Sequence, residues 1–445
     1  MPPVPSVSSI PSVPLSRRQL LLGGASLAGI AALAGCARAG GAAPETLQFW
    51  HLLSGGDGIR MSGLLDRVNS SQSAFSVHPT VLSWGAPYYT KLAMASAGGR
   101  APDVAIMHAS RVAGYAPGGL LDAWDESHLK ELGVDASTFP DPIWKKGFSG
   151  GKLFSVALDA HPFILMYNRD IAEKAKVLGS NGQLHTIDSP EAFIETAKAI
   201  GGVAKGHPIS YGYLGDGAQM WRMFGTFYAQ QGATMTFTPG KKAEYDEDAA
   251  VTSLKFMQTL LDGKLAASDG DYGTAVAEFS TGKSGMLFTG VWELPTMEAA
   301  KLPFDAEPIP TLFGTPAAYA DSHAFVLPRQ GVVDDAKRDL VYRFVSDILK
   351  VSFDWAKAGH IPAYNPVRAT DRYAKLLPQA HYASAANIIN YDPLAWFTGS
   401  GSNFQGLFAS TIQGVLVQKQ DPAAGFRAFI ARVNKLLTQP NPVEK

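Results

Sequence analysis

Polar and aromatic side chains recur in the loops that follow the first predicted strands of this chain. Such loops hold His51, Asp57, Trp84, His108 and Arg111. Aromatic rings stack on flat apolar faces of a solute, while carboxylates, imidazoles and guanidinium groups hydrogen-bond to its polar rim. The residue types therefore predict the capture of a small polar solute rather than its chemical conversion. For Asp57, capping of the following helix is an equally open interpretation.

Composition excludes several classes of protein. The formal net charge is −1, and the basic residues are scattered, which argues against a nucleic-acid partner. A single cysteine cannot form a disulfide within the chain, and it excludes the zinc and iron–sulfur motifs that need several. The sequence contains no HExxH pair, Walker loop or nucleophile elbow. We therefore expect no cofactor, no metal and no catalytic residue, although a glycosidase that uses two carboxylates stays open as an alternative.

The elements that must position these side chains alternate in type. Residues 46–53, 75–82 and 103–108 are predicted strands, and residues 59–73 and 87–97 are predicted helices. This alternation predicts a parallel sheet covered by helices. The carboxyl ends of such strands are where ligands bind in α/β folds.

Further along, the chain becomes more helical and then returns to strands. The triplet Ser189-Pro190-Glu191 predicts a helix start, with Ser as the N-cap and Pro in the first turn. Strand-like runs recur at residues 152–158, 163–167, 285–289 and 324–327. Early and late strands separated by helices predict two lobes that share the chain discontinuously.

The first 36 residues have the layout of an export signal. Arg17 and Arg18 precede a short uncharged stretch at residues 19–35, which is too short to span a bilayer. Leu33-Ala34-Gly35-Cys36 resembles the bacterial lipobox, which implies a signal peptide at 1–35 and a lipid on Cys36. Arg17 and Arg18 resemble a twin-arginine export motif, with Leu20 in place of the usual Phe. We expect a flexible tether at residues 36–45 and a lipoprotein on the outer face of the cytoplasmic membrane.

A series of short motifs in the mature chain resembles the family 1 extracellular solute-binding proteins of ABC importers, the maltose-binding-like group. The motifs follow the family's order over roughly residues 46–366. They are Leu47-Gln48-Phe49-Trp50-His51, Gly98-Gly99-Arg100-Ala101-Pro102-Asp103-Val104, Gly151-Lys152-Leu153-Phe154, Met166-Tyr167-Asn168-Arg169-Asp170, Phe279-Ser280-Thr281-Gly282-Lys283, Gly290-Val291-Trp292 and Gly359-His360-Ile361-Pro362. Two departures are Ala157, where the family has Pro, and Asp321-Ser322-His323, which replaces a Gly-rich stretch near the expected hinge.

The resemblance implies a periplasmic-binding-protein-like α/β fold of type II, with parallel-core sheets in two lobes joined by several chain crossings. We expect lobe 1 at residues 46–158 and 324–352, and lobe 2 at residues 159–323 and 353–445. The ligand would sit between lobes that close on it. The resemblance also implies a monomer that delivers its solute to the permease subunits of an importer.

The resemblance implies a carbohydrate ligand, and the abundance of aromatic residues favours a di- or oligosaccharide. Trp292 falls where the family keeps a stacking aromatic, and Trp221 resembles a second aromatic wall; packing in the core is the alternative for both. The predicted ligand-binding residues are Trp292, Trp221, Trp84, Tyr88, Asp159, His161, Glu293, His108, Arg111, Asp57, His51, Gln219, His323, Tyr364 and Trp396. A binder of a non-sugar solute with the same fold, such as a glycerophosphodiester, stays open.

Overall fold

A computed structural model describes residues 44–442 of the chain. Cys36, Arg17, Arg18 and the predicted signal peptide at 1–35 lie outside the described residues, as does most of the predicted tether. Among residues 44–442, no helix combines the length and the apolar character needed to cross a bilayer.

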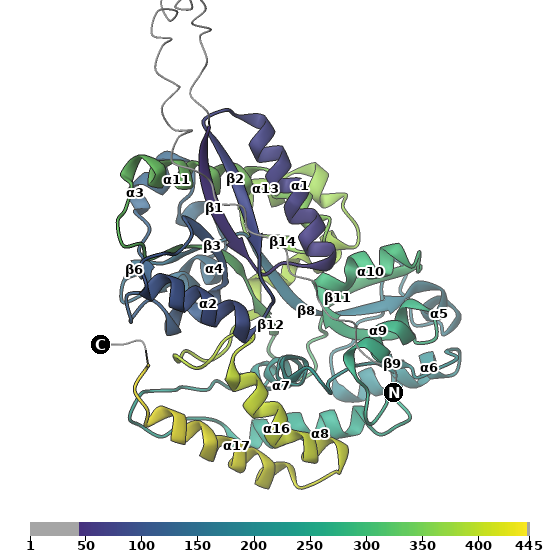
Figure 1. The fold of residues 1–445 in the computed structure, drawn as a ribbon. Coiled ribbons are helices and arrows are strands. Elements are labelled where there is room, and N and C mark those ends of the chain that lie inside the picture. Colours follow the sequence, from purple (N-terminus) through teal and green to yellow (C-terminus); the bar gives the residue numbers. More distant parts are fainter. Residues whose placement is uncertain (1–43, 443–445) are drawn as a thin grey trace, which may run out of the picture. The chain divides into compact units, whose positions relative to one another are not determined.

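The first sheet contains the amino-terminal strands and is covered by helices (Figure 1). Its strand order is β2-β1-β3-β13-β4, with β7 also pairing with β13. Strands β1, β2 and β3 are parallel, whereas β13 runs antiparallel to β3, β4 and β7. The bounds are β1 Glu45–His51, β2 Phe75–Val81, β3 Val104–His108, β4 Leu121–Asp122, β7 Ser155–Ala157 and β13 His323–Pro328.

Helices of the first lobe are amphipathic and bury one face on this sheet. Helix α1 (Gly55–Ser71) buries Met61, Leu64, Leu65 and Val68, the spacing of one helical face. The other helices of this lobe are α2 Ala86–Ala97, α3 Glu126–Glu131, α4 Asp141–Lys146 and α11 Asp335–Lys350. A small hairpin of β5 (Phe148–Ser149) and β6 (Lys152–Leu153) lies beside them. The predicted strand at 152–158 is therefore two short strands, β6 and β7, which belong to different sheets.

The second sheet is organised around the long strand β8 (Asp159–Asn168). Its order is β15-β12-β8-β10-β9, and β11 and β14 also pair with β8. The strands next to β8 are antiparallel to it, so this sheet is mixed rather than parallel at its core. The remaining bounds are β9 Ile209–Ser210, β10 Met286–Gly290, β11 Phe304–Pro308, β12 Ala318–Asp321, β14 Ile361–Pro362 and β15 Ile389–Asn390.

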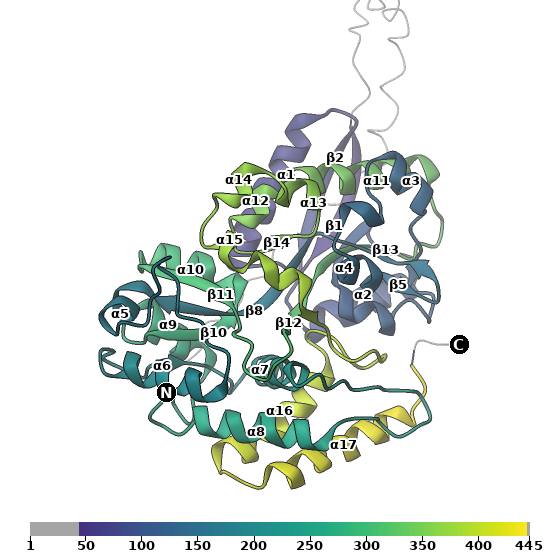
Figure 2. The ribbon, with the colours of Figure 1, turned by 180° about the vertical axis from the view of Figure 1, so that it is seen from behind.

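The second sheet carries its own helices, and the last two come from the carboxyl-terminal part of the chain. Helices α7, α8, α16 and α17 pack together at the base of the molecule (Figures 1 and 2). Their apolar side chains form a core rich in phenylalanine that is separate from the core of the first lobe. The bounds are α5 Arg169–Lys174, α6 Pro190–Gly201, α7 Gly217–Gln230, α8 Glu247–Leu260, α9 Tyr272–Ser280, α10 Leu294–Ala299, α16 Asn403–Val417 and α17 Pro422–Leu437.

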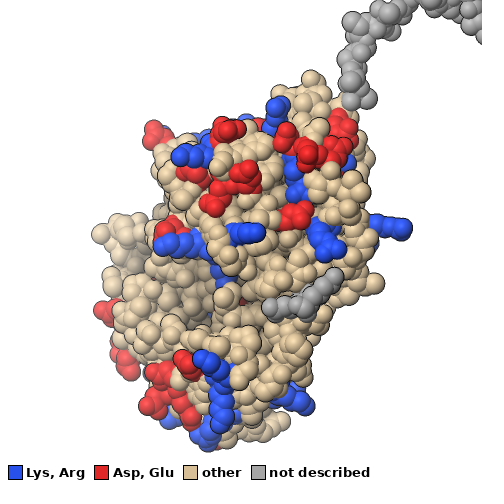
Figure 3. Space-filling view, turned by 90° about the vertical axis from the view of Figure 1, so that its left-hand side faces the viewer, with Lys and Arg blue, Asp and Glu red and all other residues tan. Residues whose placement is uncertain are grey.

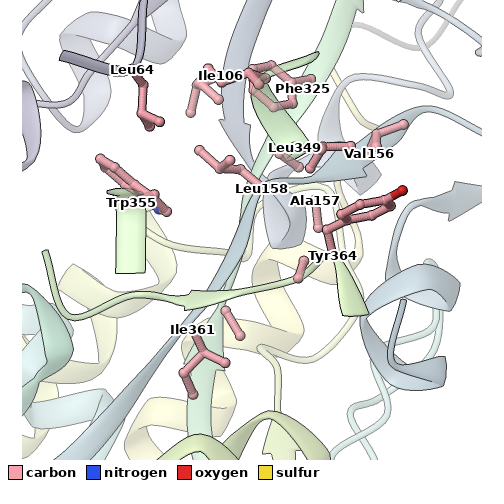
Figure 4. Packing of buried hydrophobic residues seen from close by; sticks show 14 of the residues in the cluster. Leu64, Ile106, Val156, Ala157, Leu158, Phe325, Leu349, Trp355, Ile361 and Tyr364 are labelled. Atoms are coloured by element: carbon pink, nitrogen blue, oxygen red, sulfur yellow. The ribbon is translucent and has the colours of Figure 1, made fainter. Parts of the chain in front are cut away.

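The chain changes sheet between β7 and β8 and again between β12 and β13. Each change takes one residue, Leu158 and Ser322 respectively. The lobe boundaries expected from the sequence, 158/159 and 323/324, stay a prediction; His323 belongs to β13 of the first sheet. Apolar side chains from both sheets fill the space around the first crossing, among them Leu158, Phe325 and Ile361 (Figure 4).

Short helices follow residue 352, where lobe 2 is expected to resume. These are α12 Phe353–Ala356, α13 Asn365–Arg368, α14 Asp371–Ala374 and α15 Gln379–Tyr382. Helix α12 packs on α1 of the first lobe, and Arg67 of α1 pairs with Asp354 at 2.5 Å, while β14 pairs with β8. This segment therefore lies against both sheets, and the chain after β15 also contacts the first lobe, since the Ser400 backbone N–H donates to the Ser110 hydroxyl at 3.0 Å.

On the face seen in Figure 3, acidic and basic side chains lie near one another in the upper and lower parts, with a largely uncharged band between them. Such a surface lacks the one-signed patch through which a protein steers toward nucleic acid. This distribution agrees with the low formal net charge of the chain.

Candidate ligand-binding cleft

A cleft of about 390 Å³ opens between residues of the two lobes. The start of α1, Trp84 after β2 and His108 at the end of β3 line its first side. Residues of α7, α9 and α10 line the opposite side. The described lining residues are Leu52, Leu53, Ser54, Gly55, Gly56, Asp57, Trp84, His108, His161, Asp216, Gln219, Arg222, Tyr272, Trp292, Glu293, Thr296, His323 and His360. The volume falls within the range of small-molecule sites, roughly 300–1,000 Å³.

Trp292 forms the aromatic wall of the second side, in the turn that follows β10. Its ring folds back against the strand end, and a Cβ on Gly290 would lie 1.9 Å from a ring carbon, so only glycine fits there. The Trp292 Nε1–H donates to the Tyr272 hydroxyl at 2.8 Å, and that hydroxyl donates to Glu293. The Arg222 guanidinium lies 4.6 Å from the centre of the Trp292 ring. These contacts hold the ring in one orientation before any ligand arrives.

Two polar atoms on α7 lack a partner within the described part of the chain. The Gln219 Oε1 and the Arg222 Nε are buried and make no hydrogen bond with any residue of 44–442. Both residues line the cleft, one helical turn apart. Leaving a buried polar group unpaired costs about 1–3 kcal/mol, so these two atoms fit a site that a polar ligand completes.

The floor of the cleft is a cluster of imidazole rings around one buried carboxylate, Asp159. The Nδ1 of His161 lies 3.1 Å from Asp159 Oδ1, and the Nδ1 of His323 lies 2.8 Å from Oδ2. The Nδ1 of His360 lies 3.2 Å from Oδ2, and its Nε2 lies 3.0 Å from Asp57 Oδ1. Trp355 donates its Nε1–H to Asp159 Oδ2 at 2.6 Å.

Strand pairing brings these residues together. Asp159 and His161 begin β8, and Asp321 of β12 pairs with His161. His323 begins β13 and pairs with His108 of β3, while Ile361 of β14 pairs with Ala160. Consequently His108, His161 and His323 stand with ring centres 4.2–5.2 Å apart.

The protonation behaviour of the floor follows from burial and from the two carboxylates. Burial lowers the pKa of His161 to about 4 and holds the pKa of His108 well below its usual value. Burial also disfavours the charged form of His360, but Asp57 and Asp159 outweigh it and raise the pKa of His360 to about 10. The floor therefore presents neutral imidazoles at His161 and His108, next to a positively charged one at His360.

The structure places eight of the predicted site residues in the cleft lining. They are Trp292, Trp84, Asp57, His108, His161, Glu293, Gln219 and His323. Asp57 makes no cap for α1 and instead faces His360. Asp159 lies just beneath the lining, fully buried, and orients three of the rings above it.

Trp221 and Tyr88 lie in the cores and do not line the cleft. Trp221 packs among Phe404, Phe408 and other rings of the second core and donates its Nε1–H to Asp392. Tyr88 is fully buried and donates to the carbonyl of Ile106. Packing in the core, the alternative left open for Trp221, describes both residues in this structure.

Four other predicted residues also lie outside the cleft lining. Tyr364 is buried in the first core and donates to the Gly133 carbonyl at 3.0 Å. His51 is buried behind the floor, and burial lowers its pKa to about 4. Arg111 and Trp396 line a different cavity of about 310 Å³, where the Arg111 guanidinium lies 4.4 Å from the Tyr89 ring centre.

Sequence reasoning missed several lining residues as site residues, chiefly Arg222, Tyr272, Asp216 and His360. Arg222 lies one turn after Gln219 on the same helix, so helical spacing could have paired the two. His360 lies inside the motif Gly359-His360-Ile361-Pro362. The resemblance to the family rests on the glycine and the proline of this motif, so the histidine between them gave no separate signal. Tyr272 and Asp216 carried no signal in the sequence.

Comparison with known proteins identifies a family and solved structures that share this architecture. The family of bacterial extracellular solute-binding proteins matches residues 77–356, more than half of the chain. A cyclic α-maltosyl-1,6-maltose binding protein from Arthrobacter globiformis aligns with a TM-score of 0.69 and 19% identity, over 89% of this chain and 99% of that one.

Two further solved structures have the same fold. The GacH receptor of Streptomyces glaucescens, solved free and with acarbose, aligns with a TM-score of 0.72 and 18% identity, over 89% of this chain and 99% of that one. UgpB from Mycobacterium tuberculosis, in complex with glycerophosphocholine, aligns with a TM-score of 0.73 and 17% identity, over 89% and 98%.

The two sheets, the crossings between them and the cleft where they meet thus have the arrangement of type II binding proteins such as the maltose-binding proteins. The matched segment includes both crossings and most of the cleft lining. This chain belongs to the bacterial extracellular solute-binding protein family, and it is a binding protein rather than an enzyme.

Proposed function

We propose that this protein is the substrate-binding component of an ABC importer, and that it captures a carbohydrate in the cleft and delivers it to the permease. The observation that carries this proposal is the pairing of a fixed aromatic ring, Trp292, with unpartnered polar atoms on α7. A sugar offers a C–H face to the ring and hydroxyls to Gln219 and Arg222. The neutral imidazoles of the floor add further partners for hydroxyl groups.

A glycerophosphodiester is the second candidate, because the UgpB structure holds such a ligand and Arg222 offers an unpartnered guanidinium nitrogen. However, Asp216 and Glu293 also line the cleft, together with Asp57, which pairs with the positively charged His360. Carboxylates repel a phosphate and accept hydrogen bonds from hydroxyls. The balance of charge therefore favours the neutral sugar.

A thermal-shift screen of the full chain tests the proposal against mono-, di- and oligosaccharides and glycerophosphodiesters. A ligand that binds only the folded state stabilises it by about 2.7 kcal/mol at one hundred times its Kd. We expect a shift with one class of sugar, followed by a titration that gives its Kd. A shift with phosphodiesters alone would move the function to the second candidate.

Two variants locate the binding. Trp292→Ala removes the stacking ring and should weaken sugar binding by roughly 10- to 100-fold, since each tenfold is about 1.4 kcal/mol. Trp50→Ala is the matched control, because Trp50 lies beside α2 in a separate surface groove. Equal weakening by both substitutions would contradict a site at Trp292.

We further propose that the protein is a lipoprotein, anchored through Cys36 and acting as a monomer on the outer face of the membrane. Support comes from the residues alone, namely Arg17, Arg18, the short apolar stretch and the lipobox-like Leu33-Ala34-Gly35-Cys36. Expression with a radiolabelled fatty acid should label the chain, and Cys36→Ser should abolish the label. Label that persists in the variant would refute the anchor.

A further inference from the structure

The cleft floor contains four side chains whose ligand-type atoms all lie within 4.8 Å of one another. They are Asp159, His161, His323 and His360, referred to below as the Asp159 cluster. Their exposed fractions are 0, 4, 5 and 0%, so water competes little for these atoms. We propose that the Asp159 cluster is a binding site for a divalent transition metal, with Zn²⁺ as the best match. The inference does not depend on which solute the cleft holds.

Distances within the cluster suit a shared metal. The three Nδ1 atoms lie 2.8–3.2 Å from the nearest oxygen of Asp159. In a tetrahedral zinc site with ligand bonds of about 2.0–2.2 Å, neighbouring ligand atoms stand roughly 3.3 Å apart. Three imidazole nitrogens and one carboxylate oxygen are a ligand set that zinc accepts. Small movements of the side chains would therefore complete the coordination.

His360 marks a position that a cation must occupy. Its Nε2 faces Asp57 at 3.0 Å, which places a proton on that nitrogen. Its Nδ1 is buried, lies 3.2 Å from Asp159 Oδ2 and makes no hydrogen bond with described residues. A bare nitrogen lone pair beside a carboxylate oxygen is repulsive unless a cation lies between them. That cation is either a second proton on His360 or a metal ion.

The surroundings have the form of an outer shell around a metal. A histidine that binds a metal through one nitrogen usually donates its other N–H to a carboxylate, as His360 does to Asp57. Trp355 stacks on His360 at 4.4 Å and 11°, and it donates to the Asp159 carboxylate. The backbone N–H of His323 donates to Asp159 Oδ1 at 2.9 Å. These contacts fix the ring and the carboxylate before a metal binds.

A metal here would tie together the chain segments at which the two sheets join. Asp159 and His161 follow the first crossing, His323 follows the second, and His360 precedes β14. Coordination would then hold the floor of the cleft rigid and fix the three imidazole rings that line it. The inferred role is structural, as an ion resident at the hinge.

The test uses the full chain without a polyhistidine tag, stripped with a chelator and titrated with ZnCl₂ by calorimetry. We expect one zinc per chain by elemental analysis, a rise in Tm with zinc, and, with Co²⁺, the intense visible absorption of a four-coordinate site. His360→Gln should abolish these signals. Asp57→Asn leaves the ligands in place and should weaken zinc binding by roughly 10- to 100-fold, the usual effect of an outer-shell change.

His381→Gln is the matched control, because the His381 Nδ1 pairs with Asp305 at 2.8 Å away from the Asp159 cluster. It should bind zinc as the wild type does. Circular dichroism shows whether each variant folds, and Asp57→Asn keeps the test informative if His360→Gln does not fold. Absence of zinc binding in the folded wild-type chain, or equal binding in His360→Gln, would overturn the proposal and leave a proton as the cation on His360.

Discussion

Asp159 and Asp392 are both buried, and their neighbours shift their pKa values in opposite directions. Burial alone would raise the pKa of Asp159, but His323, His360 and hydrogen bonds from His161 and His323 hold it well below its usual value. Burial and the nearby Asp321 raise the pKa of Asp392 to about 7, although hydrogen bonds from Tyr319 and Trp221 and, least of all, the charge of Lys146 lower it. Asp159 supports the cleft floor, whereas Asp392 lies within the second lobe.

The difference shows that the kind of neighbour decides whether a buried carboxylate stays charged. Imidazoles can carry positive charge and compensate an anion, while hydroxyl and indole donors offer only dipoles. At Asp392, the Gln405 amide and the Tyr319 hydroxyl donate hydrogen bonds to Oδ2 at 3.3 and 3.1 Å. These contacts form a buried polar network. At Asp159, three imidazole rings are oriented by the carboxylate and line the cleft.

Asp159→Asn should have the largest effect on stability. It removes the charge that compensates His360 and leaves buried imidazoles poorly paired, a change that typically costs about 3–5 kcal/mol. Urea unfolding in buffer with a chelator measures the loss without any contribution from metal. A loss of unfolding free energy below about 1 kcal/mol would show that the Asp159 cluster does not need a charged carboxylate. It would then contradict the difference in charge between Asp159 and Asp392.

Asp392→Asn should change the pH dependence of stability. A carboxyl group with a raised folded-state pKa contributes stability that is fully present below its unfolded pKa near 3.8 and is lost as pH rises through about 7. The asparagine variant lacks this loss, so between pH 5 and 8.5 its unfolding free energy should fall less than that of the wild type, by roughly 2–4 kcal/mol. Parallel curves for the two proteins would contradict the raised pKa.

A matched pair of tryptophan substitutions sharpens the comparison. Trp355 donates to Asp159, and Trp221 donates to Asp392. At pH 5.5 the first acceptor is charged and the second is protonated, and hydrogen bonds to charged groups contribute about 1.5–3 kcal/mol against 0.5–1.5 for neutral ones. Trp355→Phe should therefore destabilise the protein by roughly 1–2 kcal/mol more than Trp221→Phe. At pH 8.5, where Asp392 is ionised, this gap should narrow; an unchanged gap would argue against different charge states.

Tyr319→Phe should have the smallest effect. It removes one hydroxyl that donates to Asp392 Oδ2 at 3.1 Å while the ring keeps its packing. The expected loss is about 1 kcal/mol at pH 8, where the acceptor is charged, and less at pH 5. Because the hydroxyl lowers the pKa of Asp392, its removal should move the midpoint of the pH-dependent loss upward. A downward movement would contradict its role as a donor.

Local pattern predicted much of the fold and part of the site. The strands at 46–53, 75–82 and 103–108 and the helices between them correspond to β1, β2, β3, α1 and α2. Helix α7 marks a limit, since nearly all of its residues are buried, so no apolar stripe distinguishes the cleft face from the core face. The orientation of Trp221 toward the core and of Gln219 toward the cleft could not be read from its spacing.

The sequence by itself determined the two-lobed α/β plan, because strand and helix periodicity and turn residues act over a few neighbours. It also placed Trp292 in a loop after a strand and a glycine, where the ring lines the cleft. Only the tertiary structure decided that His360, His323 and Asp57 meet around Asp159. Strand register and packing between the lobes set that meeting, and these depend on contacts between residues far apart in the chain, which no local pattern encodes.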